Sequence, residues 1–155
     1  MKNVDIKIDP GDLTRLNNKI SLLRKEAPRK LSTNIAHAVK FIENDAVKNA
    51  PKRDGALRQS IGSEVVGMTA QVFANVKYAP YQEFGTGSLV NTSEAESLGI
   101  PAATIKRLYK GKGKRKINIP PQPFFFPAVR KGFKKLLDGI EKDLKQLLWK
   151  MQLDL

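Results

Sequence analysis

The ten residues Tyr78–Gly87 read Tyr-Ala-Pro-Tyr-Gln-Glu-Phe-Gly-Thr-Gly and combine three aromatic rings, one proline, two glycines and one carboxylate. A core strand would not hold Pro80 in its middle, because proline has no N–H to donate to a sheet. A solvated loop would not hold three aromatic rings. The stretch therefore predicts a strand that ends near Tyr78, then a tight aromatic corner, then a glycine turn with positive φ at Gly85 or Gly87.

The N-terminal third of the chain predicts a strand and two helices from recognisable local signals. Val4–Ile8 alternates apolar and charged residues, as in a short half-buried strand, and Asp9-Pro10 then has the residues of a helix start. The helix is expected to break or kink at Ala27-Pro28, because the residue before a proline disfavours helical backbone. A second helix with an apolar stripe is predicted over Arg29–Asn49.

A β-hairpin is predicted next, with strands at about Ser60–Val66 and Ala70–Tyr78, because apolar and polar residues alternate there. It delivers the chain to the aromatic corner. Because this aromatic cluster lies in a segment that cannot be a regular strand, we expect Tyr81 and Phe84 to be partly exposed in one subunit and covered in an assembly.

The region after the corner predicts short helices and a return to the sheet. Ser93–Glu96 resembles a capping box, and Pro101 is expected to start a helix to about Tyr109. Lys116–Ile119 is expected to rejoin the sheet as a strand, and a stiff proline-rich stretch leads to a final helix that starts at Pro127. The fold class expected is α+β: a small antiparallel sheet of hairpin, N-terminal and late strands, packed against a long helix and a C-terminal helix. One domain, 1–155, is expected, with a flexible basic excursion at about 88–117.

The composition narrows the possible partners and chemistry. The formal net charge of +13 favours a polyanionic neighbour, and the chain contains no cysteine, so disulfides and thiolate sites are excluded. We find no signal peptide and no apolar run long enough to span a bilayer, so no membrane partner is expected. Seven basic residues without an intervening acid form the candidate polyanion contact: Lys106, Arg107, Lys110, Lys112, Lys114, Arg115 and Lys116.

Candidates for catalysis or metal binding are few. His37 is the single histidine, and its place in a helical run favours a boundary residue of a packed helix over a ligand or a base. Glu83 in the aromatic corner is a conceivable catalytic acid or base. The preferred interpretation is structural, in which Glu83 accepts backbone N–H groups or pairs with Arg58. We expect no enzyme activity, no metal and no cofactor.

Three separated motifs, taken in order, resemble one known family. They are Ala50-Pro51 with Asp54–Ile61 (Asp-Gly-Ala-Leu-Arg-Gln-Ser-Ile), then Tyr78–Gly87, then Pro121–Ala128 (Pro-Gln-Pro-Phe-Phe-Phe-Pro-Ala). The order and spacing resemble the minor tail-component family of long-tailed double-stranded DNA phages and prophages, described as tail-completion or head–tail joining (neck) proteins. Asp54 stands where that family usually has threonine. The resemblance extends from about Ala36 to the C-terminus.

The resemblance implies a structural virion protein without catalysis. It implies a homo-oligomeric ring, expected to be hexameric, that completes the tail or joins it to the head and meets other neck and tail proteins and DNA in the channel. The implied location is the virion, with host cytoplasm during assembly. The motif residues expected at the subunit interface are Leu57, Arg58, Tyr78, Tyr81, Glu83, Phe84, Gly85, Thr86, Gly87, Phe124 and Phe126.

Two other function classes stay open from the sequence. One is a basic nucleic-acid-binding protein that grips phosphates with Lys106–Lys116. The other is a hydrolase that uses Glu83. Steeply salt-dependent duplex binding would favour the first, whereas discrete rings or neighbouring portal and tail genes would favour the phage subunit.

Overall fold

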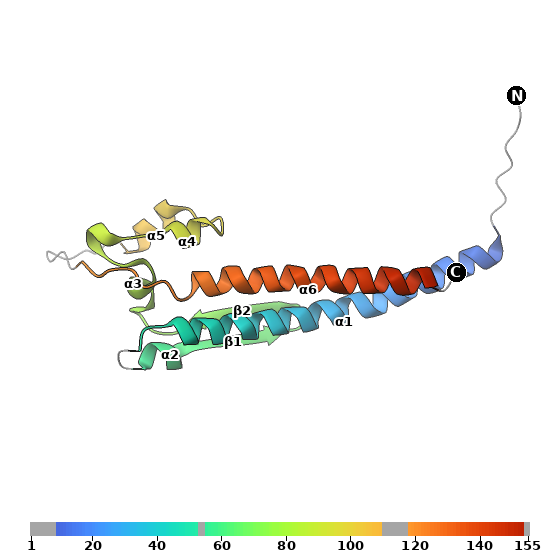
Figure 1. The fold of residues 1–155 in the computed structure, drawn as a ribbon, viewed down its shortest axis with the longest axis horizontal. Helices are drawn as coiled ribbons and strands as arrows, with labels where there is room; N and C mark the ends of the chain where they lie inside the picture. The colour runs from blue at the N-terminus through green and yellow to red at the C-terminus, as the bar shows by residue number, and fades with distance from the viewer. Residues whose placement is uncertain (1–8, 53–54, 110–117, 154–155) are drawn as a thin grey trace, which may run out of the picture.

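Two long antiparallel helices dominate the molecule (Figure 1). A computed structural model describes residues 9–52, 55–109 and 118–153. Of the described elements, α1 (Pro10–Asn49) and α6 (Phe126–Leu153) are the long helices. The others are α2 (Ala56–Ser60), β1 (Ile61–Val66), β2 (Thr69–Ala74), α3 (Ala79–Phe84), the 3₁₀ turn η1 (Gly87–Leu89), α4 (Ser93–Glu96) and α5 (Ala102–Tyr109). The predicted α+β class is confirmed.

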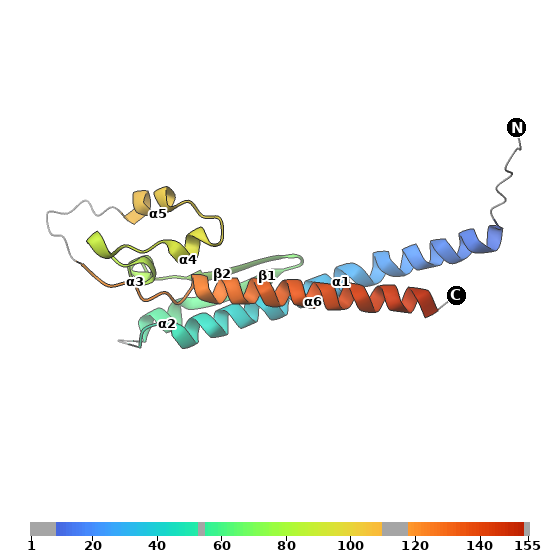
Figure 2. The same ribbon diagram turned by 45° about the horizontal axis from the view of Figure 1, so that its top comes forward.

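Helix α1 begins at the predicted cap and ends at the predicted residue. The Asp9 carboxylate accepts the N–H of Gly11 at 2.9 Å, and Pro10 occupies the first turn, where its missing N–H costs nothing. Of the predicted break or kink at Pro28, the break is wrong, because α1 runs unbroken for 40 residues and curves along its length (Figure 2). Pro28 deprives only the carbonyl of Arg24 of its helical donor. That residue is exposed, so water can supply the missing hydrogen bond.

The contact between α1 and α6 depends on two glycines of α6. A Cβ on Gly132 would lie 2.1 Å from Cγ1 of Ile42, and a Cβ on Gly139 would lie 2.7 Å from the Asn34 side-chain oxygen. Absence of side chains at these points lets the helices approach closely. Lys30 and Asn34 of α1 both donate to the Asp143 carboxylate of α6, at 2.7 and 2.8 Å.

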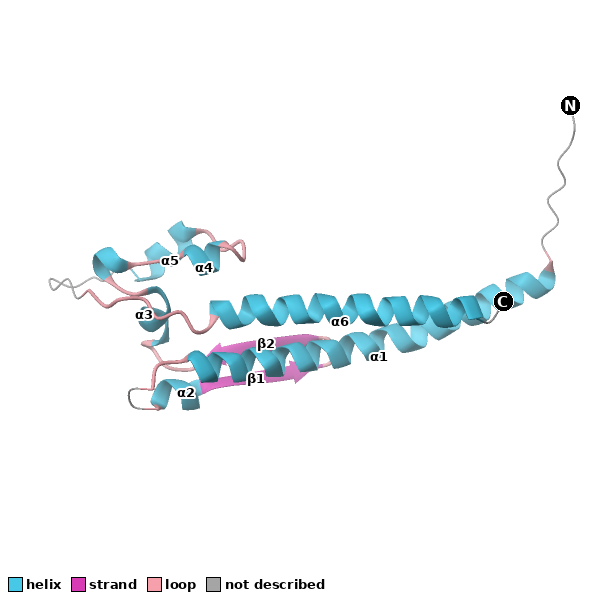
Figure 3. Ribbon diagram, in the orientation of Figure 1, coloured by secondary structure: helices cyan, strands magenta, loops and turns pink. Residues whose placement is uncertain are grey.

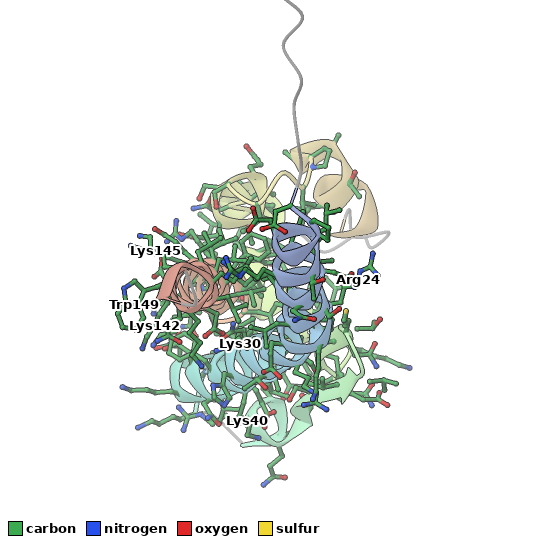
Figure 4. The ribbon with its side chains drawn as sticks, turned by 90° about the vertical axis from the view of Figure 1, so that its right-hand side faces the viewer. Arg24, Lys30, Lys40, Lys142, Lys145 and Trp149 are labelled. Atoms are coloured by element: carbon green, nitrogen blue, oxygen red, sulfur yellow. The ribbon has the colours of Figure 1, made fainter. Side chains whose placement is uncertain are left out.

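The hairpin packs on α1, on a different side from α6 (Figures 3 and 4). Its strands are antiparallel with Ile61 opposite Ala74 and Val66 opposite Thr69, and Gly67 adopts φ 61° in the two-residue turn. Ser63 donates to Glu43 of α1, and Ser32 of α1 donates to the carbonyl of Gly67 at 3.2 Å. The hairpin is therefore anchored to α1 at both its middle and its tip.

The sheet is smaller than predicted. The second strand ends at Ala74, four residues before Tyr78, because the chain turns there to enter α3. The predicted strand Val4–Ile8 lies outside the described residues. Of the predicted strand Lys116–Ile119, the described residues Asn118 and Ile119 are not in a strand.

Two buried clusters hold the remaining elements. The larger joins α1, α2, β1 and the start of α6 through Ile42, Ala46, Leu57, Ile61, Phe124 and Ala128. The smaller joins α3, α4 and α5 through Phe84, Ala95 and Ile105. Helix α4 starts at Ser93, so its N-cap is Thr92, one residue before the predicted cap Ser93. The Thr92 hydroxyl donates a hydrogen bond to the Glu96 carboxylate. Helix α5 begins directly after Pro101, close to the predicted start.

Candidate assembly surfaces

The stretch that carries the second motif is a short helix and not an irregular aromatic corner. Helix α3 begins after Tyr78, and Pro80 fits in its first turn, where its missing N–H is tolerated. The predicted glycine turn follows, with φ 75° at Gly85 and 65° at Gly87, and this prediction is confirmed. A Cβ on Gly85 would lie 2.8 Å from the carbonyl oxygen of Ile119, so only glycine permits this close approach.

Glu83 is the residue that joins the second motif to the third. Its carboxylate is 4% exposed and accepts three successive backbone N–H groups: Phe124 and Phe125 on Oε2, both at 2.8 Å, and Phe126 on Oε1 at 3.0 Å. Phe126 is the first residue of α6, so a side chain 43 residues away caps that helix. A negatively charged carboxylate at the N-terminus of a helix also interacts favourably with the helix dipole. The predicted role of accepting backbone hydrogens is confirmed.

Arg58 of the first motif performs the complementary task at the end of α1. Its Nε donates to the carbonyl of Ala50 at 2.9 Å, and its Nη2 donates to the carbonyl of Lys48 at 3.1 Å. A positive side chain at a helix C-terminus satisfies orphan carbonyls. The pairing of Arg58 with Glu83 that the sequence left open is not formed.

Thr86 of the second motif also binds Ile119, which lies two residues before the third motif. Its N–H donates to the carbonyl of Ile119 at 3.0 Å, and its hydroxyl accepts the N–H of Ile119 at 2.9 Å. In addition, Gln122 donates its N–H to the carbonyl of Gln82 at 2.7 Å. The residues before α6 therefore run alongside α3, and this placement replaces the predicted late strand.

The motif residues divide into a buried framework and a few exposed side chains. Phe84 is 6% exposed, so the expectation that it is partly exposed in one subunit is wrong; it packs against Phe126, with ring centroids 5.5 Å apart. Tyr81, at 38% exposed, does face outward. Within the motifs, Leu57, Gly85 and Phe124 are buried, Arg58, Thr86 and Phe126 are half-buried, and Tyr78 and Gly87 are exposed.

The largest exposed apolar features lie on the two long helices. Leu13, Leu16 and Ile20 form a row on the first turns of α1, which project beyond the end of α6 (Figure 1). Leu16 is 53% exposed because α6 ends before it can cover this part of α1. On α6 the exposed row is Phe133, Leu137, Leu144 and Leu148, with Trp149 on another face.

Sequence reasoning missed these rows as separate surfaces. The apolar stripe of α6 is wider than the single helix α1 can cover. Its width is the signal that should have indicated a second covered face. Trp149 lies outside that stripe, and its indole points away from α1 (Figure 4).

The outer face of the hairpin is also apolar in part. Val66, Met68 and Phe73 are all exposed, and the Phe73 ring lies over Gly62, where a Cβ would be 3.0 Å from it. Gln71 donates to Glu64 beside this ring at 2.8 Å. The hairpin therefore presents an apolar tip and a polar centre.

Basic side chains surround the α1–α6 pair. Lys142 and Lys145 project from α6 away from α1, whereas Lys30 lies between the helices, and Arg24 and Lys40 stand on α1 (Figure 4). An open groove of about 480 Å³ between the helices is lined by Lys135 and Lys142 together with the exposed His37. The charged groups of Lys106 and Arg107, and all of 110–117, lie outside the described part, so the polyanion contact expected over Lys106–Lys116 stays a prediction.

Two carboxylates at the helix and hairpin contacts have lowered pKa values. Hydrogen bonds from Lys30 and Asn34 lower the pKa of Asp143, and hydrogen bonds from Lys40 and Ser63 lower the pKa of Glu43. The described residues contain no group of three histidine, cysteine or acidic side chains arranged to hold a metal ion. No described helix combines the length and apolarity needed to cross a membrane.

One family model matches the part of the chain that contains most of α1, together with α2, the hairpin and α3. Residues 14–85 match the family described as "Bacteriophage HK97-gp10, putative tail-component". This tail-component match confirms the resemblance stated from the motifs. It covers just under half of the chain, and no curated protein and no solved structure matches.

The boundaries of the tail-component match differ from those expected. The match begins in the first turns of α1, well before Ala36, and ends at Gly85, the residue after α3. It therefore includes Arg58 and Glu83 but not the third motif, to which Glu83 binds. The contacts of Glu83 join the matched part to α6.

Proposed function

We propose that this protein is a structural subunit of a phage tail or neck, in which copies of the chain form a closed ring that completes the tail or joins it to the head. The tail-component match over 14–85 supports the coarse class. The ring and its place at the head–tail junction are our proposal. A sixfold ring is the arrangement implied by the family resemblance.

The observation that carries the proposal is the apolar row Leu13, Leu16 and Ile20 on the projecting end of α1. Three large aliphatic side chains at helical spacing are partly exposed in the single chain. Burying a fully exposed side chain of this kind stabilises by about 1.5–3 kcal/mol, so covering each of these three contributes about half of that. A subunit that contacts identical copies can bury such a row in that contact. A head-to-tail contact between different surfaces closes into a ring when its rotation permits.

The charge of the chain suits the proposed place. Twenty-eight basic residues against fifteen acidic ones leave a surface that an acidic neck protein or channel DNA would neutralise. The buried Glu83 carboxylate accepts three backbone N–H groups of the residues that lead into α6, which supports a role in holding the subunit together. These contacts favour the structural role that we propose.

The proposal is tested in the phage or prophage that encodes the chain. Deletion of the gene should leave filled heads and tails that fail to join, or tails that are not completed, when particles are viewed by negative stain. Complementation with wild-type chain should restore joined particles, and complementation with Leu16→Asp should not. The matched control is Asn18→Asp, which adds the same charge at an exposed polar position of the same helix. Normal infectious particles from the deletion would contradict the proposal.

A second candidate function, nucleic-acid binding by the free protein, is favoured by the net charge of +13. If the seven basic residues of Lys106–Lys116 neutralise seven phosphates, the logarithm of the duplex affinity should fall with that of the salt concentration with a slope of about −6. Weak duplex binding, together with salt-sensitive assembly, would indicate an acidic protein partner.

A further inference from the structure

Strand β2 has an outer edge that no described backbone group occupies. The N–H of Asn75 donates to the carbonyl of Ser60 at 2.9 Å, so Ser60 and Asn75 form a hydrogen-bonded pair. From this pair, hydrogen-bonded and non-hydrogen-bonded pairs alternate along β1 and β2. In that alternation Ala70, Val72 and Ala74 direct their N–H and carbonyl groups away from β1. Such an edge accepts a further strand.

The outer edge of β1 is less open. Its first outward N–H, that of Ile61, already donates to the carbonyl of Arg58 in α2. A third strand would therefore find a longer row of open groups beside β2. A two-stranded sheet also gains stability from a third strand, since an isolated hairpin is marginal in water.

The sequence contains one segment with the pattern of such a strand. In Val4–Ile8 the apolar residues Val4, Ile6 and Ile8 alternate with Asp5 and Lys7. On β2, the half-buried Ala70, Val72 and Ala74 alternate in the same way with the exposed Gln71 and Phe73. An added strand of this pattern would continue both faces of the sheet.

The unbroken helix α1 prevents this segment from reaching the hairpin of its own chain. The hairpin tip is fixed beside Ser32, because that hydroxyl donates to the carbonyl of Gly67. Asp9 lies 23 residues earlier on α1, which is about 35 Å at the rise of a helix. Residues 4–8, fully extended, span at most about 18 Å. Both views show the start of α1 at one end of the long axis, well separated from the hairpin (Figures 1 and 2).

We propose that Val4–Ile8 of one copy adds as a third strand to β2 of a second copy of this chain. This inference rests on the proposed ring, and it specifies which surfaces meet in it. With the added strand antiparallel to β2, Ile8 of the donor lies toward the tip of the acceptor hairpin. The row Leu13, Leu16 and Ile20 then follows close to the exposed Val66 and Met68 at that tip. Every copy is then both donor and acceptor, as a head-to-tail ring requires.

The absence of native cysteine allows a direct test by disulfide formation. Two single-cysteine chains are mixed, one with Lys7→Cys and one with Gln71→Cys, and oxidised. Both side chains lie on the polar face of the proposed sheet. Because the register between the strands is not fixed, Asp5→Cys replaces Lys7→Cys in a parallel mixture. Disulfides need Cα atoms within about 7 Å, which neighbouring strands satisfy.

The expected result is a covalent dimer in at least one of the two mixtures, several-fold more abundant than in either chain alone. The matched control pairs the same donor with Glu64→Cys on β1. That residue is two strands from the donor at about 5 Å per strand, too far for a disulfide, so its mixture should show only the background. An equal dimer yield with Glu64→Cys would contradict the choice of the β2 edge.

Native mass spectrometry of the same samples distinguishes a failure of the strand exchange from a failure of the ring. Assemblies without a cross-link from Asp5→Cys or Lys7→Cys would overturn the strand exchange and leave the ring standing. A chain that stays monomeric would overturn both. A chain carrying both cysteines that cross-links only within itself, at monomer mass, would overturn the proposal as well. Deletion of residues 1–8 should abolish assembly, and its persistence would contradict the exchange.

Discussion

The Glu83 carboxylate accepts the N–H of Phe126 at 3.0 Å, so a residue of α3 caps the first turn of α6. Nothing in the local sequence of α6 provides this cap, because the residues before it are prolines and phenylalanines. The contact fixes where α6 starts relative to α3, and α6 in turn packs along α1.

Glu83→Ala should destabilise the fold strongly. Three backbone N–H groups at 2.8–3.0 Å would lose their acceptor, and each buried unsatisfied group costs about 1–3 kcal/mol. We expect a loss of at least about 3 kcal/mol in the free energy of unfolding, measured by chemical denaturation. Glu83→Gln, which keeps one acceptor oxygen, should lose less. The exposed Glu64→Ala is the control, and equal losses for Glu83→Ala and Glu64→Ala would refute this role.

Gly132→Ala should disturb the contact between the long helices. The added Cβ would lie 2.1 Å from Cγ1 of Ile42, and such overpacking costs about 1–3 kcal/mol. Because the clash is with one side chain, the double variant Gly132→Ala with Ile42→Ala should lose less stability than the two single losses added together. A double-mutant cycle on unfolding free energies measures this coupling. Strict additivity would show that the helices move apart instead.

Asp143 should contribute to stability at neutral pH and lose its contribution in acid. Hydrogen bonds from Lys30 and Asn34 lower its pKa in the folded state below the ordinary value of 3.8. The folded carboxyl thus binds a proton less readily than the unfolded one, so the contribution is present above pH 3.8 and falls as the pH drops through the lowered pKa. Asp143→Asn should reduce stability at neutral pH and flatten the acid limb of a denaturation series. An unchanged acid limb would contradict this assignment.

Phe84 and Tyr81 should respond in opposite ways to truncation. Phe84→Ala removes a buried ring of the small cluster, and the loss should be about 3–5 kcal/mol of unfolding free energy. Tyr81→Ala removes a ring that is partly exposed and should cost far less. Thermal unfolding of the two variants distinguishes them. If the Tyr81 variant were the less stable, the division of this motif into framework and surface would be wrong.

Local signals predicted much of the fold. The Asp9-Pro10 start of α1, its end at Asn49 and the positive φ of the two glycines after α3 each follow from the residue types at those positions. The break at Pro28 was not correct, because the tertiary contact with α6 and the hairpin outweighs the loss of one helical hydrogen bond. The shortened second strand follows from Pro80, which favours the first turn of a helix as strongly as it opposes a strand.

The candidate surfaces were harder to predict, because the exposure of a side chain depends on which distant segment packs against it in the fold. Phe84 and Tyr81 lie three residues apart in one aromatic stretch, and only the packing of Phe126 decides that Phe84 is buried. Leu16 has the spacing of a core residue, and it is exposed only because α6 ends short of it. Neither fact can be read from periodicity.

The central claim, that copies of this chain form a closed ring through the projecting end of α1, is tested most directly by native mass spectrometry of the purified chain over a concentration series. We predict one discrete assembly, which for six chains of 17.3 kDa is about 104 kDa. We also predict that Leu16→Asp is a folded monomer while Asn18→Asp assembles like wild type. A wild-type chain that stays at 17.3 kDa at every concentration, or a Leu16→Asp chain that assembles unchanged, would contradict the account.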